Sequence, residues 1–130
     1  ELRVNTLKDA SGNNSVATSV LFGGSGKAWI NMNGTGTIAI RDSYNIASIT
    51  DNGTGDHTQT FTSAFTNNDY APAAATQDDE SDTSNFTTSY PAIYRSTTGL
   101  ATSAMRLGTG SGSTRYDITG IFASVHGDLA

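Results

Sequence analysis

Short apolar segments recur along the chain, and clusters of Gly, Asn and Asp separate them. A spacing of about 8–12 residues between such segments is typical of an all-β sandwich or barrel. Helical periodicity is not evident in any window long enough to reveal it. The pattern predicts an all-β fold, an antiparallel and jelly-roll-like β-sandwich of about 8–9 short strands. These strands are expected at 2–7, 16–22, 27–32, 37–41, 46–50, 57–65, 92–97, 104–107 and 116–125.

The segment 27–32 alternates as a half-buried strand does. Ala28, Ile30 and Met32 fall on one face of this segment. Trp29 falls on the other face, because successive side chains of a strand point to opposite sides of the sheet. We therefore expect the face with Ala28, Ile30 and Met32 to point to the core.

Two Asn-Gly-Thr-Gly tetrapeptides mark tight turns, at 33–36 and at 52–55. Asn-Gly is a strong hairpin signal, because both residues tolerate a positive φ. Each tetrapeptide lies between two predicted strands. The sequence therefore predicts two hairpins, 27–32 with 37–41 and 46–50 with 57–65.

The remaining segments predict loops and a simple domain organisation. Gly108–Gly112 is expected to form a flexible loop before the last strand, and 78–82 an exposed acidic loop. The alanine run 71–75 is too short for a helix and contains a proline, so no element is predicted there. We expect a single β-sandwich domain at 21–130. An N-terminal arm, or the first strands, at 1–20 precedes it and contacts a partner.

The composition is unusual for a chain that must build a core. Gly, Thr, Ser and Asn make up nearly half of the residues, and only 35% are hydrophobic. A single domain of this length buries roughly two-thirds of its unfolded surface. We therefore expect a second copy of the chain to complete a thin core. The expected contact is either 104–107 or a set of apolar residues near the N-terminus, Leu2, Val4, Leu7, Val16, Val20 and Phe22.

Charge and residue content exclude several classes of protein. The chain has 7 basic and 12 acidic residues, a formal net charge of -5, whereas nucleic-acid binding requires a concentrated positive face. No apolar run approaches the roughly 18 residues that a membrane helix needs. Cysteine is absent, which excludes disulfides, thiolate zinc sites and cysteine nucleophiles. We expect no nucleic-acid partner, no membrane insertion and no cofactor.

Acidic clusters are the candidates for a metal site. Asp78, Asp79, Glu80 and Asp82 supply oxygen ligands. Such clusters are more often solvated loops, and a cation that bridges this loop to another chain is the alternative. The acidic turn 51–56 lacks the ligand spacing of an EF-hand and is interpreted as a hairpin turn.

Catalytic signals are weak. The two histidines are His57 and His126, and His57 follows a turn at a strand start, where we expect it to face solvent. The stretch 23–27 lacks the closing glycine of a nucleophile elbow and does not match a phosphate-binding loop. The acidic residues lie in turns, in loops or beside an arginine, which does not favour the paired carboxylates of a glycosidase. We expect no enzymatic activity.

Aromatic residues offer a candidate binding surface. Tyr90, Tyr94 and Tyr70 are predicted to be exposed and to stack against a sugar. Core and cross-strand packing is the alternative for these three and for the other residues considered, Trp29, Tyr44 and Tyr116.

The block 27–56 has a distinctive sequence, KAWINMNGTGTIAIRDSYNIASITDNGTGD. It resembles a module from tailed bacteriophages of marine and freshwater bacteria, including cyanophages and pelagiphages. The opening 2–12 and the closing Ile121-Phe122 fit this module as well, whereas 72–115 matches only loosely. His57 and Met32 stand where such sequences often carry an aromatic or a larger apolar residue.

The resemblance implies a virion structural protein, commonly of tail-fibre type, with no enzymatic activity and no catalytic residue. It implies a location on the surface of the phage particle, after assembly in the host cytoplasm. It also implies a homotrimer, as is common among exposed phage parts. The expected partners are other virion proteins, either of the tail or the major capsid protein, and a host surface glycan.

Two positions on the particle fit this class of protein. A tail module for host attachment would occur in few copies and gather aromatic loop residues at one distal end. A capsid decoration protein, which cements the head, would occur in many copies and clamp the shell with an ordered, non-globular N-terminal arm. A carbohydrate-binding module outside phages and an unrecognised hydrolase are further alternatives.

Overall fold

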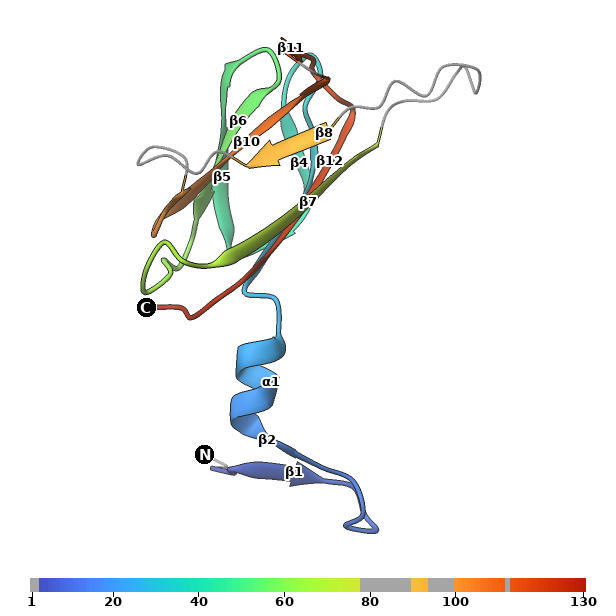
Figure 1. The fold of residues 1–130 in the computed structure, drawn as a ribbon, viewed down its shortest axis with the longest axis vertical. Helices are drawn as coiled ribbons and strands as arrows, with labels where there is room; N and C mark the ends of the chain where they lie inside the picture. Colours follow the sequence, from blue (N-terminus) through green and yellow to red (C-terminus); the bar gives the residue numbers. More distant parts are fainter. Residues whose placement is uncertain (1–2, 78–89, 94–99, 112) are drawn as a thin grey trace.

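Two antiparallel sheets pack face to face, and a hairpin followed by a short helix extends from one end of this sandwich (Figure 1). The structure is a computed structural model that describes residues 3–77, 90–93, 100–111 and 113–130. The extension comprises β1 (Thr6–Lys8), β2 (Ser15–Ala17) and α1 (Thr18–Gly24).

The two sheets of the sandwich are both antiparallel. The first has the strand order β4 (Ala39–Tyr44), β3 (Ala28–Asn33), β12 (Gly120–His126) and β7 (Ala71–Gln77). The second has the order β11 (Thr114–Arg115), β10 (Ala104–Ser111), β6 (Asp56–Phe61) and β5 (Ile46–Gly53), and β8 (Tyr90–Ile93) and β9 (Leu100–Ala101) also pair with β10. The predicted all-β sandwich is therefore confirmed.

Inward-facing side chains of the central strands form the core. In the first sheet Met32 lies opposite Ile121, and Ile30 lies opposite Ala123. All four are buried, so the face predicted from the alternation of 27–32 is the one that points inward. The second sheet contributes Phe61, Met105 and Leu107, which close the core from the other side.

Both predicted hairpins are present. β3 pairs with β4, and β5 pairs with β6. In the second turn Gly55 has a φ of +60°, and a Cβ added to it would lie 2.8 Å from the Tyr116 carbonyl oxygen. A residue with a side chain would be strained there by its backbone conformation and by the clash. The turn 51–56 therefore depends on glycine, as its sequence predicts.

The structure corrects three expectations about individual segments. The predicted strand 16–22 ends at Ala17, and the chain continues as the helix α1. The segment 71–77 forms strand β7, because it lies at a sheet edge, where a proline is tolerated. Gly108–Ser111 belongs to β10 and is not a loop. Gly110 approaches Arg115 so closely that an added Cβ would lie 3.1 Å from its Cα.

His57 faces the core and not the solvent. β6 begins at Asp56, so His57, Gln59 and Phe61 all point inward, and His57 is fully buried. His57 lies opposite Leu107 and Gln59 lies opposite Met105. Neither ring nitrogen of His57 has a hydrogen-bond partner within the described chain. The expectation of a solvent-facing histidine is wrong, because His57 shares the inward face of β6 with Gln59 and Phe61.

Asp56 anchors the start of β6 through two arginines. Arg106 Nε donates to Oδ1 at 2.6 Å and Arg106 Nη2 donates to Oδ2 at 2.5 Å, which makes the pair bidentate. Arg115 Nη1 also donates to Oδ2. The carboxylate is 3% exposed. Hydrogen bonding by Arg106, supported by Arg115, outweighs the burial of the carboxyl group and lowers the pKa of Asp56 to about 2.

Replacing this carboxylate tests its contribution. A pKa lowered from 3.8 to about 2 stabilises the fold above pH 3.8, and the stabilisation disappears as the pH falls through the folded-state pKa. Asp56→Asn is expected to lower the free energy of unfolding by about 2 kcal/mol at pH 7. The difference from the wild type should shrink towards pH 2.

Urea denaturation at pH 7 and at pH 2.5 measures both values. Asp42→Asn removes the same charge from an exposed strand position and should change stability by no more than about 0.5 kcal/mol. Equal stability of Asp56→Asn and the wild type at pH 7 would contradict this role of the ion pair.

Candidate functional site

The N-terminal segment stands apart from the sandwich. Residues 3–26, which we call the arm, extend from the end of the sandwich at which β3 begins (Figure 1). The predicted boundary between 1–20 and 21–130 falls inside α1, because this helix continues to Gly24. The arm is therefore a few residues longer than the sequence pattern suggests.

Side-chain hydrogen bonds hold the turn of the arm hairpin. The Asp9 carboxylate accepts hydrogen bonds from Asn14 Nδ2 at 2.7 Å, Ser11 Oγ at 2.9 Å and the Asn13 amide at 3.0 Å. Hydrogen bonds from Asn14 and Ser11 lower the pKa of the Asp9 carboxyl group. Gly12 has a φ of +73°, which completes the turn. The hairpin thus has a defined turn although its residues are largely exposed.

Two residues connect α1 to its surroundings. At its start, the Thr18 amide donates to the Asn5 carbonyl oxygen at 2.9 Å. At its end, Lys27 Nζ donates to Ser25 Oγ at 2.8 Å and to the Phe22 carbonyl oxygen. The Lys27 amide donates to the Val125 carbonyl oxygen at 2.7 Å. Lys27 therefore ties the last turn of the helix to the first sheet.

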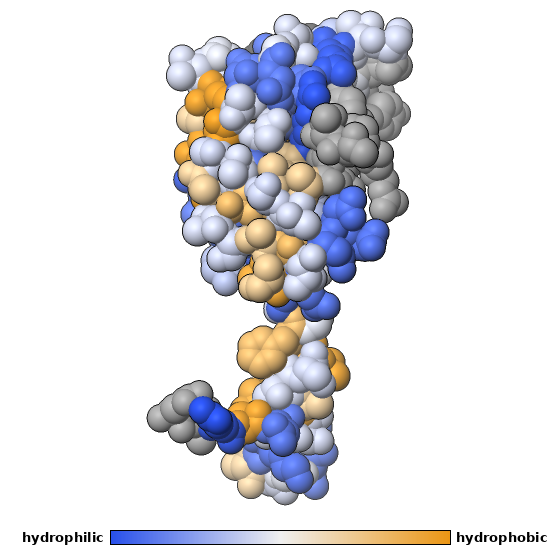
Figure 2. Space-filling view, turned by 90° about the vertical axis from the view of Figure 1, so that its left-hand side faces the viewer, coloured by the Kyte–Doolittle hydropathy of each residue, from blue (hydrophilic) through white to orange (hydrophobic). Residues whose placement is uncertain are grey.

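The arm exposes most of its apolar residues. Phe22 is 70% exposed and Val20 is 63% exposed, while Val4, Leu7 and Leu21 are between 40% and 46% exposed. No residue of α1 is buried. Figure 2 shows apolar atoms on the narrow arm below the sandwich. On their own, a two-stranded hairpin and a seven-residue helix are not stable unless they bury apolar side chains. The arm therefore has the properties of a segment that packs against a partner.

The residues predicted to contact a partner lie mainly on this arm. Val4, Leu7, Val20 and Phe22 are exposed there, and Val16 is half-buried. Leu2 lies outside the described residues. The alternative contact 104–107 is not exposed, because Met105 and Leu107 belong to the core. The structure therefore exposes part of one predicted contact set, on the arm, and buries the apolar residues of the other.

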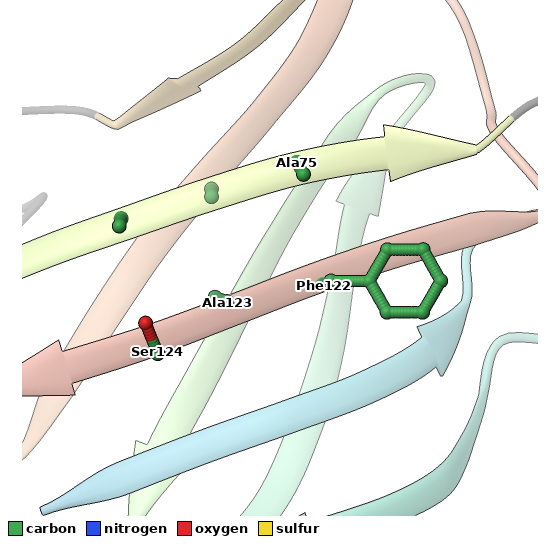
Figure 3. Close-up of a pocket in the computed structure, with 6 residues that line it drawn as sticks. Ala75, Phe122, Ala123 and Ser124 are labelled. Atoms are coloured by element: carbon green, nitrogen blue, oxygen red, sulfur yellow. The ribbon is translucent and has the colours of Figure 1, made fainter. Parts of the chain in front are cut away.

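The outer face of β7 and β12 has a shallow apolar depression. Ala73, Ala75, Phe122 and Ser124 point outward here, and Ala74 and Ala123 complete its lining. Figure 3 shows the Phe122 ring at one end of this depression, with Ala75 on β7 and Ser124 on β12. We call it the outer hollow. No charged side chain lines it.

A second hollow lies where the arm meets the sandwich. Phe22 lines it from the arm, Tyr44 from β4, and Asp128 from the C-terminal segment, together with Lys27 and Leu129. The Lys27 ammonium lies 5.8 Å from the centre of the Phe22 ring. The arm is thus held to the sandwich at its base and leaves space beside it.

The tyrosines predicted to bind sugar do not form an exposed cluster in the described structure. Tyr70 is 3% exposed, and its hydroxyl donates a hydrogen bond to the Ala104 carbonyl oxygen at 3.0 Å. Burial raises its pKa to about 12. It packs with Phe61 and Phe65 as part of the core, so the prediction of an exposed Tyr70 is wrong. Tyr90 lies in β8, and Tyr94 lies outside the described residues.

The predicted metal ligands fall outside the described residues, namely Asp78, Asp79, Glu80 and Asp82. Among the residues that are described, no group of three His, Asp or Glu side chains could hold a metal ion. In the same part of the chain, α1 is far shorter than a membrane-spanning helix, and no helix qualifies as one.

Trp29 and Tyr44, for which the sequence leaves core or cross-strand packing as the alternative to sugar stacking, form an exposed aromatic pair. They lie opposite each other on β3 and β4, and side chains of directly opposite residues share a face of the sheet. Trp29 is 39% exposed and Tyr44 is 55% exposed. The signal was present in the sequence, because Trp29 alternates with the core residues Ala28 and Ile30.

Comparison of the chain with models of protein families, with curated proteins and with solved structures found no match.

The stability of the sandwich should not depend on the exposed side chains of the arm. Replacing Val20 and Phe22 together by serine is expected to change the free energy of unfolding by no more than about 0.5 kcal/mol, because neither residue is buried. Leu107→Ala, a fully buried position, is expected to cost about 2–5 kcal/mol. Urea denaturation of dilute protein, followed by Trp29 fluorescence, measures both. Similar losses in the two variants would contradict the description of the arm.

Proposed function

We propose that this chain is a non-enzymatic structural protein of a phage particle, attached to its assembly through the arm. The observation that carries the proposal is an ordered N-terminal segment whose apolar side chains are exposed beside a sandwich with a core of its own. A segment of this kind is stabilised by packing against a partner. The resemblance of 27–56 to a module of tailed phages supports the particle as the place of assembly.

The titratable groups support a structural role. Asp56 has a strongly lowered pKa, which is often a sign of a functional site. Its carboxylate is engaged by Arg106 and Arg115, and this ion pair holds the start of β6. His57 is enclosed by the core between the sheets. Asp56 and His57 are therefore both explained as structural parts of the fold.

On the particle, the arm favours decoration of the capsid. A decoration protein grips the shell through an ordered, non-globular segment, and the hairpin β1–β2 with α1 has this form. The tail-fibre alternative requires exposed aromatic residues at a distal end. One of its three candidates, Tyr70, is in the core. We therefore rank head decoration before a tail module.

Binding of a host glycan is the second candidate function, and one specific observation favours it. Trp29 and Tyr44 present two aromatic rings on one face of the first sheet. Exposed aromatic rings provide a flat apolar surface against which a sugar ring can pack. Asn31 and Asp42 form the next pair on the same face of these two strands, and their polar groups suit the hydroxyl groups of a sugar.

Counting the protein in purified particles tests the first candidate. A decoration protein is expected in copy numbers comparable to those of the major capsid protein, and a tail module in a small multiple of three. Quantitative mass spectrometry of intact virions gives this ratio. The variant with serine at positions 20 and 22 should no longer bind particles that lack the protein. Absence of the protein from virions would contradict the proposal.

A binding assay on an array of neutral host polysaccharides tests the second candidate. Trp29→Ala and Tyr44→Ala are each expected to weaken binding by about tenfold, because each removes one stacking surface. Tyr116→Ala, an aromatic residue that is 42% exposed elsewhere on the sandwich, is the matched control. No binding by the wild type, or equal losses in all three variants, would exclude this face as a glycan site.

A further inference from the structure

The arm needs an apolar surface to cover α1. Val20, Leu21 and Phe22 are all exposed on this helix, and the helix contains no charged residue. The surface that receives it must therefore be apolar and uncharged, with room for large side chains.

The sandwich itself carries a surface of this kind. The outer hollow has small outward-facing residues, Ala73, Ala75 and Ser124, beside the ring of Phe122 (Figure 3). Strand β5 of the other sheet shows the usual polar exterior, because Ser48 and Thr50 are exposed there. The outer face of β7 and β12 thus differs from a solvated sheet face both in polarity and in shape.

The charge of the chain limits where two copies can touch. Each copy has a formal net charge of -5, so most of one surface repels that of another. α1 and the outer hollow are both free of charged side chains. Contact between them buries apolar area without placing like charges together.

We propose that the arm of one copy docks on a second copy, with α1 over the outer hollow and its Val20 and Phe22 beside Phe122. This inference rests on the proposed role of the arm in attachment and names a second copy of the chain as its partner. In a single copy α1 extends away from the sandwich (Figure 1), and Lys27 holds it in that direction through Val125.

Such a contact joins two different surfaces and is therefore head-to-tail. A head-to-tail contact forms a closed ring if the rotation between copies closes, and an open filament if it does not. Each copy would then both give an arm and receive one.

Disulfide trapping tests this arrangement in the full chain, and the absence of native cysteine makes every disulfide informative. In Val20→Cys/Ala75→Cys, mild oxidation is expected to give covalent dimers and trimers on a non-reducing gel. Peptide mapping should place the bond between positions 20 and 75 of different chains. The matched control is Val20→Cys/Thr50→Cys, which carries its second cysteine on the polar exterior of β5 and should remain monomeric.

The other outcomes overturn the inference. A disulfide within one chain would mean that the arm folds back on its own sandwich. Dimers of the Val20→Cys single variant in the same yield would mean that arms meet each other. Absence of any crosslink would mean that a different partner covers the arm.

A second measurement uses no cysteine. Ala75→Arg introduces a charge at an exposed position in the outer hollow, so it should leave the thermal unfolding of the sandwich unchanged. In sedimentation velocity it is expected to weaken self-association at least tenfold, as should Phe22→Ser. If both variants assemble like the wild type, the inference is wrong. Loss of self-association in Ala75→Arg together with normal particle binding would support the contact independently of attachment to the virion, because Ala75 lies outside the arm.

Discussion

The packing of β3 and β12 against β6 and β10 is the interaction on which the rest of the structure depends. Ile30, Met32 and Ile121 enter from one sheet, and Met105 and Leu107 enter from the other. Because these strands are central in their sheets, their alternation determines which residues face outward. This alternation places Trp29 and Phe122 on the exterior of the first sheet, where Phe122 lies opposite Asn31, two residues along β3 from Trp29. The surfaces available for binding are therefore a consequence of the core.

Much of the sandwich could be predicted from the sequence, and the reasons are local. Asn-Gly turns and strict alternation in 27–32 specify a hairpin without knowledge of the rest of the chain. The failures have a different origin. β7 is a strand because β12 offers a partner to an alanine-rich segment, and α1 is too short to have a detectable period. His57 is buried because it lies on the same face of β6 as Gln59 and Phe61, which points to the core.

The candidate site was predicted in outline only. The apolar residues of the arm were identified because they cluster near the N-terminus, and exposure of Phe22 and Val20 agrees with this role. The aromatic residues were harder to assign. Tyr70 lies close to Phe61 in the sequence and in the fold. Only the packed structure, however, shows that the two rings meet edge to face, with their centres 5.7 Å apart. The outer hollow could not be predicted, because it is formed by residues from β7 and β12, which are distant along the chain.

The edges of the first sheet affect how many copies of the protein can coexist at high density. An unprotected edge strand is a template for another strand and leads to open-ended aggregation. β7 is one edge of this sheet and contains Pro72, which has no amide hydrogen to donate. β4 is the other edge, and a bulge opposite Asn31 and Met32 interrupts its regular ladder. Neither edge is a regular template for a further strand. Copies crowded side by side would therefore meet through faces and arms and would not extend this sheet from one molecule to the next.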